Sequence, residues 1–283
     1  KIYLRNHDYA NAKTYIDMVL NSGQYELESD FKYVWSENNK YGKEMIFALL
    51  HETGNNAAEI ACHFGPSDHP EVPGRWQYYG VSLPFWRSYD KEDPRREFFY
   101  YDYTGDAKRD DQSDYGFHYM VPEEGVTVVP NDTTKYMQNV ATMKYTYDMI
   151  SDAYYDGRTI CIFRLSDVIL CKAEIENNLN GPAAALPYLN QIRARAGAPE
   201  YGKHNRFPAP STKEAMNDAI LKERGYELVF EFQRRADLIR FGKYEEVVNA
   251  HLKKLGIAQP TNVTSSLRYF PYPLNDAQLN PNY

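Results

Sequence analysis

The stretch that decides the fold is LSDVILCKAEIENNLNGPAAALPYLNQIRARAG, at residues 165–197. Apolar residues recur in both halves of it with a spacing near 3.6 residues, which is typical of two amphipathic helices. Asn180 and Gly181 are expected to end the first helix, and Pro182 suits the first turn of the second. Gly197 is expected to end the second helix. Because the connection is short, the stretch predicts a helical hairpin.

Further helices are expected on both sides of this hairpin. Asp8 is a plausible N-cap for a helix near the N-terminus. Ser211 and Glu214 form a capping box, and the apolar stripe that follows them continues to Gly242, with Gly225 marking a bend. Another helix is expected to follow from about Tyr244 to Leu255. The pattern therefore predicts a mainly α fold.

Two segments look like related helix pairs. They are LRNHDYANAKTYIDMVL from Leu4 and LNGPAAALPYLNQIRARAG from Leu179, and both show a break, a small residue, an aromatic residue and an aliphatic run. This is the style of a tetratricopeptide repeat, although His7 stands where that repeat favours Gly. Such pairs bury their faces by stacking, and the chain opens inside a periodic segment. We therefore expect N-terminal repeats upstream of Lys1.

The chain divides into three regions by composition. Residues 1–23 are expected to be the end of an N-terminal helical scaffold, and 161–283 a helical region with an extended tail. Residues 24–160 carry most of the Pro, Gly, Asn and aromatic residues and few long periodic segments. Long loops in a compact domain are often functional, so 24–160 is the predicted ligand-binding region, with short strands such as 47–50 and a short helix at 82–89.

Charge and hydropathy exclude two classes of protein. With 32 Lys and Arg against 39 Asp and Glu, the net charge is −7, whereas a general nucleic-acid binder needs a basic surface. No stretch approaches the 18 apolar residues of a membrane-spanning helix.

The three cysteines, Cys62, Cys161 and Cys171, lack the spacing of a zinc site. Cys161 and Cys171 could pair, but buried free thiols are the favoured interpretation.

Known catalytic and metal-binding signatures are missing. The run that starts at His51 and Glu52 lacks the second His of a zinc helix, and no GxSxG, GxGxxG or phosphate-binding loop occurs. Paired glycosidase carboxylates have no fixed spacing, so a glycoside hydrolase remains an alternative. An acidic run could offer ligands to calcium, but it lacks the spacing of a calcium loop, and a solvated loop is favoured. It comprises Asp106, Asp110, Asp111 and Asp114.

Charged residues alternate along the helix expected after Ser211. Glu223, Glu227 and Glu231 recur every four residues, with Arg224, Arg234, Arg235, Asp237 and Arg240 interleaved. These residues could form an ion cluster that holds a ligand. The favoured interpretation is a set of salt bridges that tie the helix to its neighbours, and exposed pairs of this kind stabilise by only ~0.3–0.5 kcal/mol each.

Aromatic residues are the most informative feature. The chain has 26 Tyr, 13 Phe and 3 Trp, which together make 15% of it. They concentrate between Trp76 and Tyr103, among Gly, Pro, Arg and Asp in loop-like sequence. A sugar ring presents a flat apolar face and a rim of hydroxyls, so an aromatic ring stacks on the face while polar side chains bond the rim. Each stacked ring would add about 0.5–1.5 kcal/mol beyond burial, if the figure for aromatic pairs transfers.

This reasoning gives a set of candidate glycan-binding residues. The rings are expected to supply the stacking surface and their polar neighbours the contacts to hydroxyls. The alternative is that these rings pack the loops onto the helices, which is the interpretation we take for Phe85, Phe98 and Phe99. The candidates are Arg75, Trp76, Gln77, Tyr78, Tyr79 and Trp86.

Several motifs together resemble the SusD/RagB family. RLSDVILCKAEIENNLNG from Arg164, LPYLNQIRARAGAP from Leu186 and ILKERGYELVFEFQRRADLIRFGKY from Ile220 are similar to that family's helical signatures. YFPYPLNDAQLNPNY from Tyr269 looks like its closing segment, and EDPRREFFYYDY from Glu92 resembles its Asp-Pro-Arg motif. The resemblance covers the C-terminal half or slightly more of a family member.

The resemblance implies a function that the residues alone do not. It implies a fold of tetratricopeptide-like pairs with an irregular loop-rich face, and a lipid-anchored location on the cell surface at the outer membrane, through an N-terminal segment missing from this chain. It also implies binding of oligosaccharide or polysaccharide for a SusC-like TonB-dependent transporter, with no catalysis and no cofactor. The alternative is a helical-repeat module that binds protein or peptide.

Overall fold

The structure is a computed structural model in which the chain forms two compact units, Lys1–Glu231 and Phe232–Tyr283. These units do not coincide with the three regions expected from composition, whose boundaries stay a prediction. The structure describes residues 1–53, 60–66, 69–72, 76–105, 116–126, 133–148, 157–254 and 263–268.

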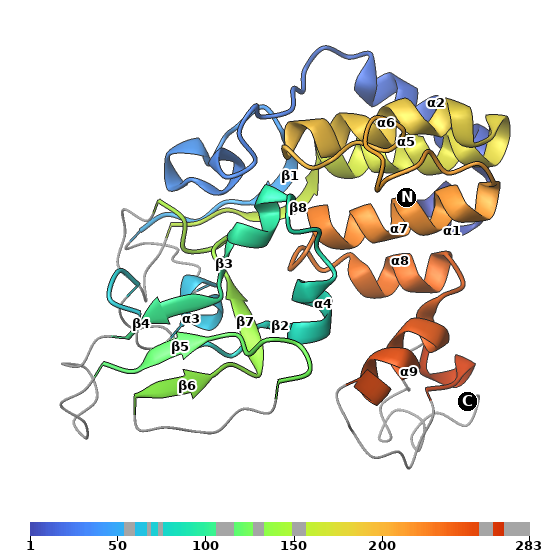
Figure 1. Ribbon diagram of the computed structural model, residues 1–283. Coiled ribbons are helices and arrows are strands. Elements are labelled where there is room, and N and C mark those ends of the chain that lie inside the picture. The colour runs from blue at the N-terminus through green and yellow to red at the C-terminus, as the bar shows by residue number, and fades with distance from the viewer. Residues whose placement is uncertain are drawn as a thin grey trace, which may run out of the picture. The chain divides into compact units, whose positions relative to one another are not determined.

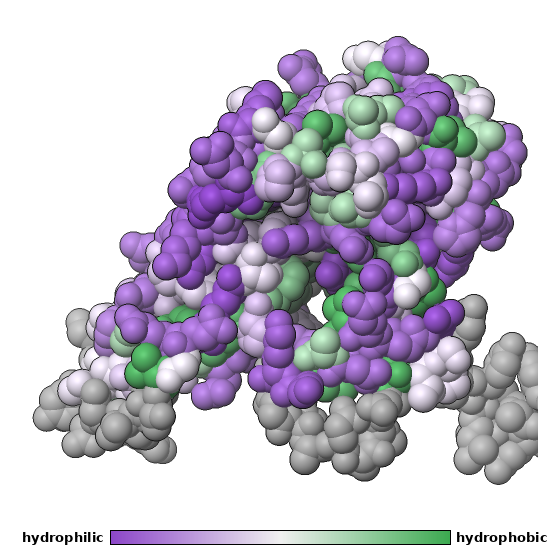
Figure 2. Space-filling view, turned by 45° about the vertical axis from the view of Figure 1, so that its right-hand side comes forward, coloured by the Kyte–Doolittle hydropathy of each residue, from purple (hydrophilic) through white to green (hydrophobic). Residues whose placement is uncertain are grey.

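A layer of packed helices forms one side of the first unit (Figure 1). The long α5 packs against α2, α6 and α7, and it buries apolar side chains such as Ile175 completely. The outer surface of these helices, at the top of Figure 2, is mostly hydrophilic with isolated hydrophobic residues, as expected of amphipathic helices. The helices of this layer are α1 (Ile2–Arg5), α2 (Tyr9–Leu20), α5 (Leu165–Asn180), α6 (Pro182–Arg195) and α7 (Lys213–Glu227).

The predicted helical hairpin is confirmed by α5 and α6. The helices meet at Gly181, whose φ of 89° is in the region that favours glycine, and Pro182 opens α6. At the other end of the layer, Asp8 caps α2 by accepting a hydrogen bond from the Asn11 amide at 3.1 Å, as expected. His7 just before it has a φ of 57°, which explains why a glycine suits this position in the repeat.

Two expectations about α7 are wrong. Its N-cap is Thr212, whose hydroxyl accepts from the Ala215 amide at 3.1 Å, and not Ser211 one residue earlier. Its apolar stripe does not continue as one helix, because α7 ends at Glu227 and not at a bend around Gly225. Phe230 and Phe232 both have a φ of 61°, which breaks the helix before the next one begins.

Three small sheets lie beyond the helical layer. The antiparallel pair β1 (Met45–Leu49) and β8 (Ile160–Arg164) leads directly into α5 and confirms the expected strand at 47–50. The other sheets have three strands each, in the orders β2-β7-β3 and β4-β5-β6, and β5 and β6 pair in parallel. Their strands are β2 (Val81–Ser82), β3 (Phe99–Tyr100), β4 (Asp102–Thr104), β5 (His118–Met120), β6 (Thr134–Tyr136) and β7 (Asn139–Thr142).

Short helices precede β1 and lie in the connections between the later strands. The expected helix at 82–89 is confirmed as α4, and α3 is followed by the aromatic-rich segment. The short elements are α3 (Ile60–Phe64), α4 (Leu83–Arg87), η1 (Tyr33–Trp35), η2 (Glu37–Asn39) and η3 (Pro94–Glu97).

A buried charge cluster joins the helical layer to the sheets. Arg164 at the end of β8 contacts Glu44, Glu227 and Glu231 with N–O distances of 2.6–2.7 Å. Arg95 from η3 contacts Glu223 at 2.6 Å and Glu227 at 3.0 Å. The charge cluster comprises Glu44, Asp93, Arg95, Lys144, Arg164, Arg193, Arg195, Glu223, Glu227 and Glu231, and each of these side chains is at most 5% exposed.

This arrangement confirms that Glu223, Glu227 and Glu231 form salt bridges to neighbouring elements, and it shows that these salt bridges lie in the interior. The pairs are buried, not exposed, so a lost partner leaves a charge away from water. Burial alone would raise the pKa of Glu227, but the charges of Arg195, Arg164 and Arg95 outweigh it and hold that pKa well below its ordinary value. Burial also lowers the pKa of Lys144 to about 8, against the attraction of Glu231.

The three cysteines are free and buried, which confirms the favoured interpretation. Cys62 and Cys161 belong to the sheet side of the unit, and Cys171 lies in α5. Burial raises the pKa of the Cys161 thiol to about 12, with Glu231 adding to the shift. The Cys161 thiol therefore stays protonated, whereas the Cys171 sulfur contacts the Asp167 carboxylate at 3.7 Å and the Arg224 guanidinium at 3.5 Å.

The second unit contains α8 (Arg234–Arg240), α9 (Tyr244–Lys254) and η4 (Ser265–Arg268). The expected helix over 244–255 is confirmed by α9, and Asp237 pairs with Arg240 at 3.1 Å. Arg268 binds both carboxylate oxygens of Glu245, at 2.6 and 3.1 Å, which holds η4 against α9.

Candidate functional site

The aromatic-rich segment is tied to the C-terminal end of α3. The Trp76 amide donates to the Cys62 carbonyl at 2.6 Å, and the Tyr79 amide donates to the His63 carbonyl at 3.1 Å. The last carbonyls of a helix have no partner within it, so this segment satisfies them. A five-residue helix thus fixes the backbone of residues 76–79.

The side chains of this segment form a cluster of rings that is open to water. We call Trp76, Tyr78 and Tyr79 the aromatic surface; they are 40%, 65% and 54% exposed. The His63 ring lies among them, with centroid distances of 5.1 Å to Trp76, 5.5 Å to Tyr78 and 6.2 Å to Tyr79. Each ring of the surface therefore has a neighbour that holds it and area left for a ligand.

The aromatic surface continues into the hydrophobic core. Phe64, next to His63, is buried and its ring lies 5.3 Å from that of Tyr79. The centroid of the Phe64 ring also lies 4.6 Å from that of Tyr145 and 5.0 Å from that of Phe230. A binding surface anchored in this way loses little freedom when a ligand orders it.

Gln77 occupies an unusual backbone position between two of these rings. Its φ is 50°, a left-handed conformation that costs a residue other than glycine roughly 1–2 kcal/mol. Such conformations persist where the surroundings hold them and are concentrated at functional sites. The Gln77 residue is half-buried. Arg75, the other polar candidate, lies outside the described residues.

Trp86 does not belong to the aromatic surface, contrary to the sequence-based expectation. It is 5% exposed, its Nε1–H donates to the Arg96 carbonyl at 3.2 Å, and the Arg96 guanidinium lies 4.1 Å from its ring centroid. A sugar cannot stack on a ring that is covered in this way. Phe98 and Phe99 are also buried, which confirms the packing role assigned to them.

The sequence did not indicate His63 and Phe64, the two residues that support the rings. They lie in the short run IACHF, which has no helical period to distinguish it from a strand or a loop. They support the rings only because residues 76–79 pack against the end of α3, and no local sequence pattern predicts that contact.

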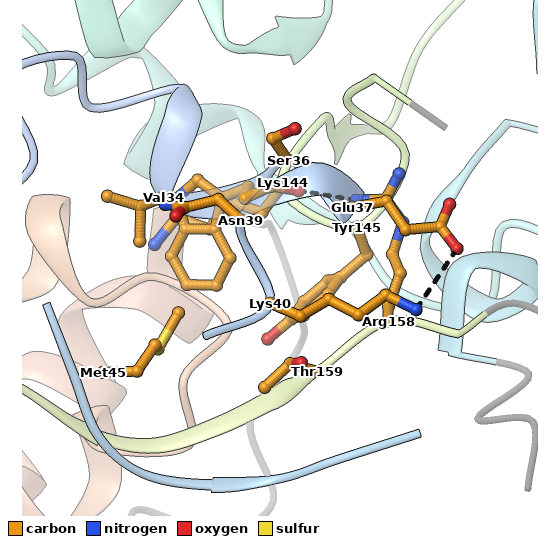
Figure 3. Close-up of a pocket in the computed structure, with 11 residues that line it drawn as sticks. Val34, Ser36, Glu37, Asn39, Lys40, Met45, Lys144, Tyr145, Arg158 and Thr159 are labelled. Atoms are coloured by element: carbon orange, nitrogen blue, oxygen red, sulfur yellow. Dashed lines mark hydrogen bonds and ion pairs between the residues drawn. The ribbon is translucent and has the colours of Figure 1, made fainter. Parts of the chain in front are cut away.

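A small cavity beside the charge cluster is too small for a sugar. Figure 3 shows Lys144, Tyr145, Arg158 and Thr159 around it, with the Lys40 side chain among them. Its volume of about 20 Å³ is comparable to the space that one water molecule needs. This cavity therefore offers no room for a sugar ring.

Among the described residues, no group of three or more His, Cys, Asp and Glu side chains is placed to hold a metal ion. The acidic candidates Asp106, Asp110, Asp111 and Asp114 lie outside those residues. Within the same part of the chain, none of the helices combines the length and the apolar character needed to cross a bilayer.

Comparison with known proteins decides the family. The profile of the SusD family matches residues 43–283. The chain belongs to the SusD family. This membership confirms the resemblance drawn from the motifs, and the mainly α fold with short strands is the SusD-like fold that they implied.

Individual relatives within the SusD family span much more than this chain. SusD-like protein P25 of Formosa agariphila is 39% identical over 120 residues, which are 42% of this chain and 22% of that protein. SusD-like protein P38 of the same organism is 25% identical over 88% of this chain and 51% of its own length. The chain therefore spans about half the length, or less, of these relatives.

Solved structures of the SusD type share the fold. One is surface glycan-binding protein A from Bacteroides thetaiotaomicron in complex with laminarihexaose. It superposes with a TM-score of 0.66 at 20% identity, over 98% of this chain and 60% of that one. At this identity the likeness establishes the fold and leaves the ligand to be argued from the site.

Proposed function

We propose that the protein binds oligosaccharides on the aromatic surface, without cleaving them. The observation that carries this proposal is that three neighbouring rings are 40–65% exposed while the residues beneath them are tied to the core. An exposed cluster of large rings costs solvation free energy unless a ligand covers it. Tyrosines also present a hydroxyl beside an apolar face, which matches a sugar.

The polar partners suit a neutral ligand. The Gln77 amide has donors and an acceptor, so it can bond to a pair of neighbouring hydroxyls, and Arg75 in the same segment adds donors. Residues 76–80, WQYYG, contain no carboxylate, so a cationic ligand would find no charged partner in this segment. Stacking then supplies the affinity, and these polar groups fix the orientation.

The relatives support this choice of ligand. A solved structure of the same fold holds laminarihexaose, and the family profile covers the whole segment that forms the aromatic surface. We propose further that the protein acts at the outer-membrane surface, held by a lipid anchor, and passes its oligosaccharide to a SusC-like TonB-dependent transporter.

Substitution of single rings tests the proposal. Hexasaccharides from glucans, mannans, galactans and xylans are screened by calorimetry against the parent protein, Trp76→Ala and Tyr78→Ala. Loss of one stacked ring is expected to weaken binding by about two- to tenfold, since each ring adds about 0.5–1.5 kcal/mol beyond its burial. Tyr41→Ala is the matched control, because Tyr41 is 73% exposed and lies on another segment.

Two results would contradict the proposal. Equal affinity of both variants and the parent would remove the aromatic surface as the site. Release of reducing ends from any of these oligosaccharides by the purified protein would show an enzyme instead.

A further inference from the structure

A second cavity lies in the helical layer, apart from the aromatic surface. Side chains of α2, of the segment that follows it, of α5 and of α6 line it. Its volume is about 510 Å³, within the range of about 300–1,000 Å³ that is usual for small-molecule sites. None of its lining residues belongs to the aromatic surface. We call this cavity the helical pocket.

The helical pocket combines an apolar floor with two tyrosine rings. Leu165 and Ile169, at the start of α5, are 6% and 2% exposed and form part of its floor. Tyr25 and Tyr188 line it and are half-buried. The Lys172 ammonium lies 5.7 Å from the centroid of the Tyr188 ring, which fixes one side of that ring. The pocket therefore offers flat apolar area with hydroxyls beside it.

Two amide side chains stand at the rim. Asn21, which caps the C-terminal end of α2, and Gln191 in α6 are exposed and line the pocket. Within the described part of the chain, neither amide group hydrogen-bonds to protein. Each has two donors and an acceptor, so each can bond to two neighbouring hydroxyls of a ligand.

Both acidic side chains at the pocket have lysine partners. Asp17 contacts Lys172 at 2.5 Å and Lys13 at 3.3 Å. Glu26, which is exposed, pairs with Lys43 at 3.2 Å. An ionic ligand would find no unpaired opposite charge among these groups, whereas a neutral hydroxylated one would find free amides and partly exposed carboxylate oxygens.

We infer that the helical pocket is a second carbohydrate site, which takes one or two units of a neutral oligosaccharide. The ligand class rests on the proposed function, but the pocket is separate from the aromatic surface in residues and in elements. Two sites on one chain would let the protein hold a polysaccharide at two points, which raises its avidity.

Amide hydrogen exchange locates the two sites separately. Neutral trisaccharides from glucans, mannans, galactans and xylans are added to the parent and to Trp76→Ala. We expect at least one trisaccharide to slow exchange at residues 21–27 and 188–191 equally in both proteins. Gln191→Ala, at an exposed position that leaves the core intact, should weaken this binding about two- to tenfold. Tyr188→Ala should weaken it about tenfold, and Tyr41→Ala should leave it unchanged.

The outcomes separate the two proposals. Protection confined to residues 76–79, or binding that is equal in Gln191→Ala, Tyr188→Ala and the parent, would overturn the helical pocket and leave the aromatic surface standing. Protection confined to 21–27 and 188–191 would do the reverse. If no trisaccharide protects either segment, the helical pocket is not a carbohydrate site.

Discussion

Replacing Glu227 by Gln tests how the charge cluster stabilises the first unit. The carboxylate of Glu227 is fully buried and accepts hydrogen bonds from Arg164 at 2.7 Å, from Arg95 at 3.0 Å and from Arg195. The cluster holds five acidic and five basic side chains, so Glu227→Gln leaves one positive charge uncompensated away from water.

The expected loss of unfolding free energy depends on the acidic partners that each arginine keeps. Arg164 retains Glu44 and Glu231, and Arg95 retains Asp93 and Glu223, so the loss is that of one buried partner and not of three. Breaking one buried pair costs about 3–5 kcal/mol, a large part of the roughly 5–15 kcal/mol by which domains are stable.

Urea unfolding followed by circular dichroism measures this loss. We expect the midpoint of Glu227→Gln to fall with an unchanged slope, which indicates lost stability and not a changed unfolded state. Glu26→Gln is the matched control, since its pair with Lys43 is more than 70% exposed on both sides and should contribute less than about 1 kcal/mol. If Glu227→Gln is within about 1 kcal/mol of the parent, the cluster does not stabilise the fold by charge compensation.

Three further predictions concern acid, thiols and backbone strain. Burial opposes the ionisation of Glu176, but hydrogen bonds from Lys13 and Lys172 lower its pKa to about 2. The contribution of Glu176 to the free energy of unfolding is therefore complete above about pH 4.5 and disappears as the pH falls toward 2. Glu176→Gln should flatten that part of the curve of unfolding free energy against pH. A thiol reagent at pH 8 should label no cysteine of the native protein and all three in denaturant, as measured by intact mass; rapid native labelling would contradict the buried positions. Gly197→Ala should lower the melting temperature more than Gly23→Ala, because both have a φ near 70° but only at Gly197 would the new Cβ meet Pro94, at 3.2 Å; equal shifts would mean that this contact is unimportant.

Local signals made the helical hairpin predictable, because the residues that end each helix are adjacent to it in sequence. Gly181, Pro182 and Gly197 act through their own backbone preferences. The end of α7 was not predictable, since the break at Phe230 is stabilised by a distant residue. The Tyr145 hydroxyl donates to the Phe230 carbonyl at 2.9 Å, across more than eighty positions of sequence.

The candidate site was predictable only in part, for the same reason. Trp76 and Trp86 both lie in the aromatic-rich part of the sequence, yet one is 40% exposed and the other 5%. The difference comes from Arg96, whose guanidinium and carbonyl cover Trp86, and from the return of residue 76 to α3. Composition indicated the right segment, and tertiary contacts decided which rings face water.

The charge cluster also has a consequence for how the first unit assembles. Its members are spread along the sequence from Glu44 to Glu231, and no two neighbouring helices or strands contain all of them. A half-formed intermediate would have to bury some charges before their counterparts arrived, at a penalty of several kcal/mol for each ion. Partial structures are therefore penalised, and the unit is expected to fold and unfold in a single cooperative step.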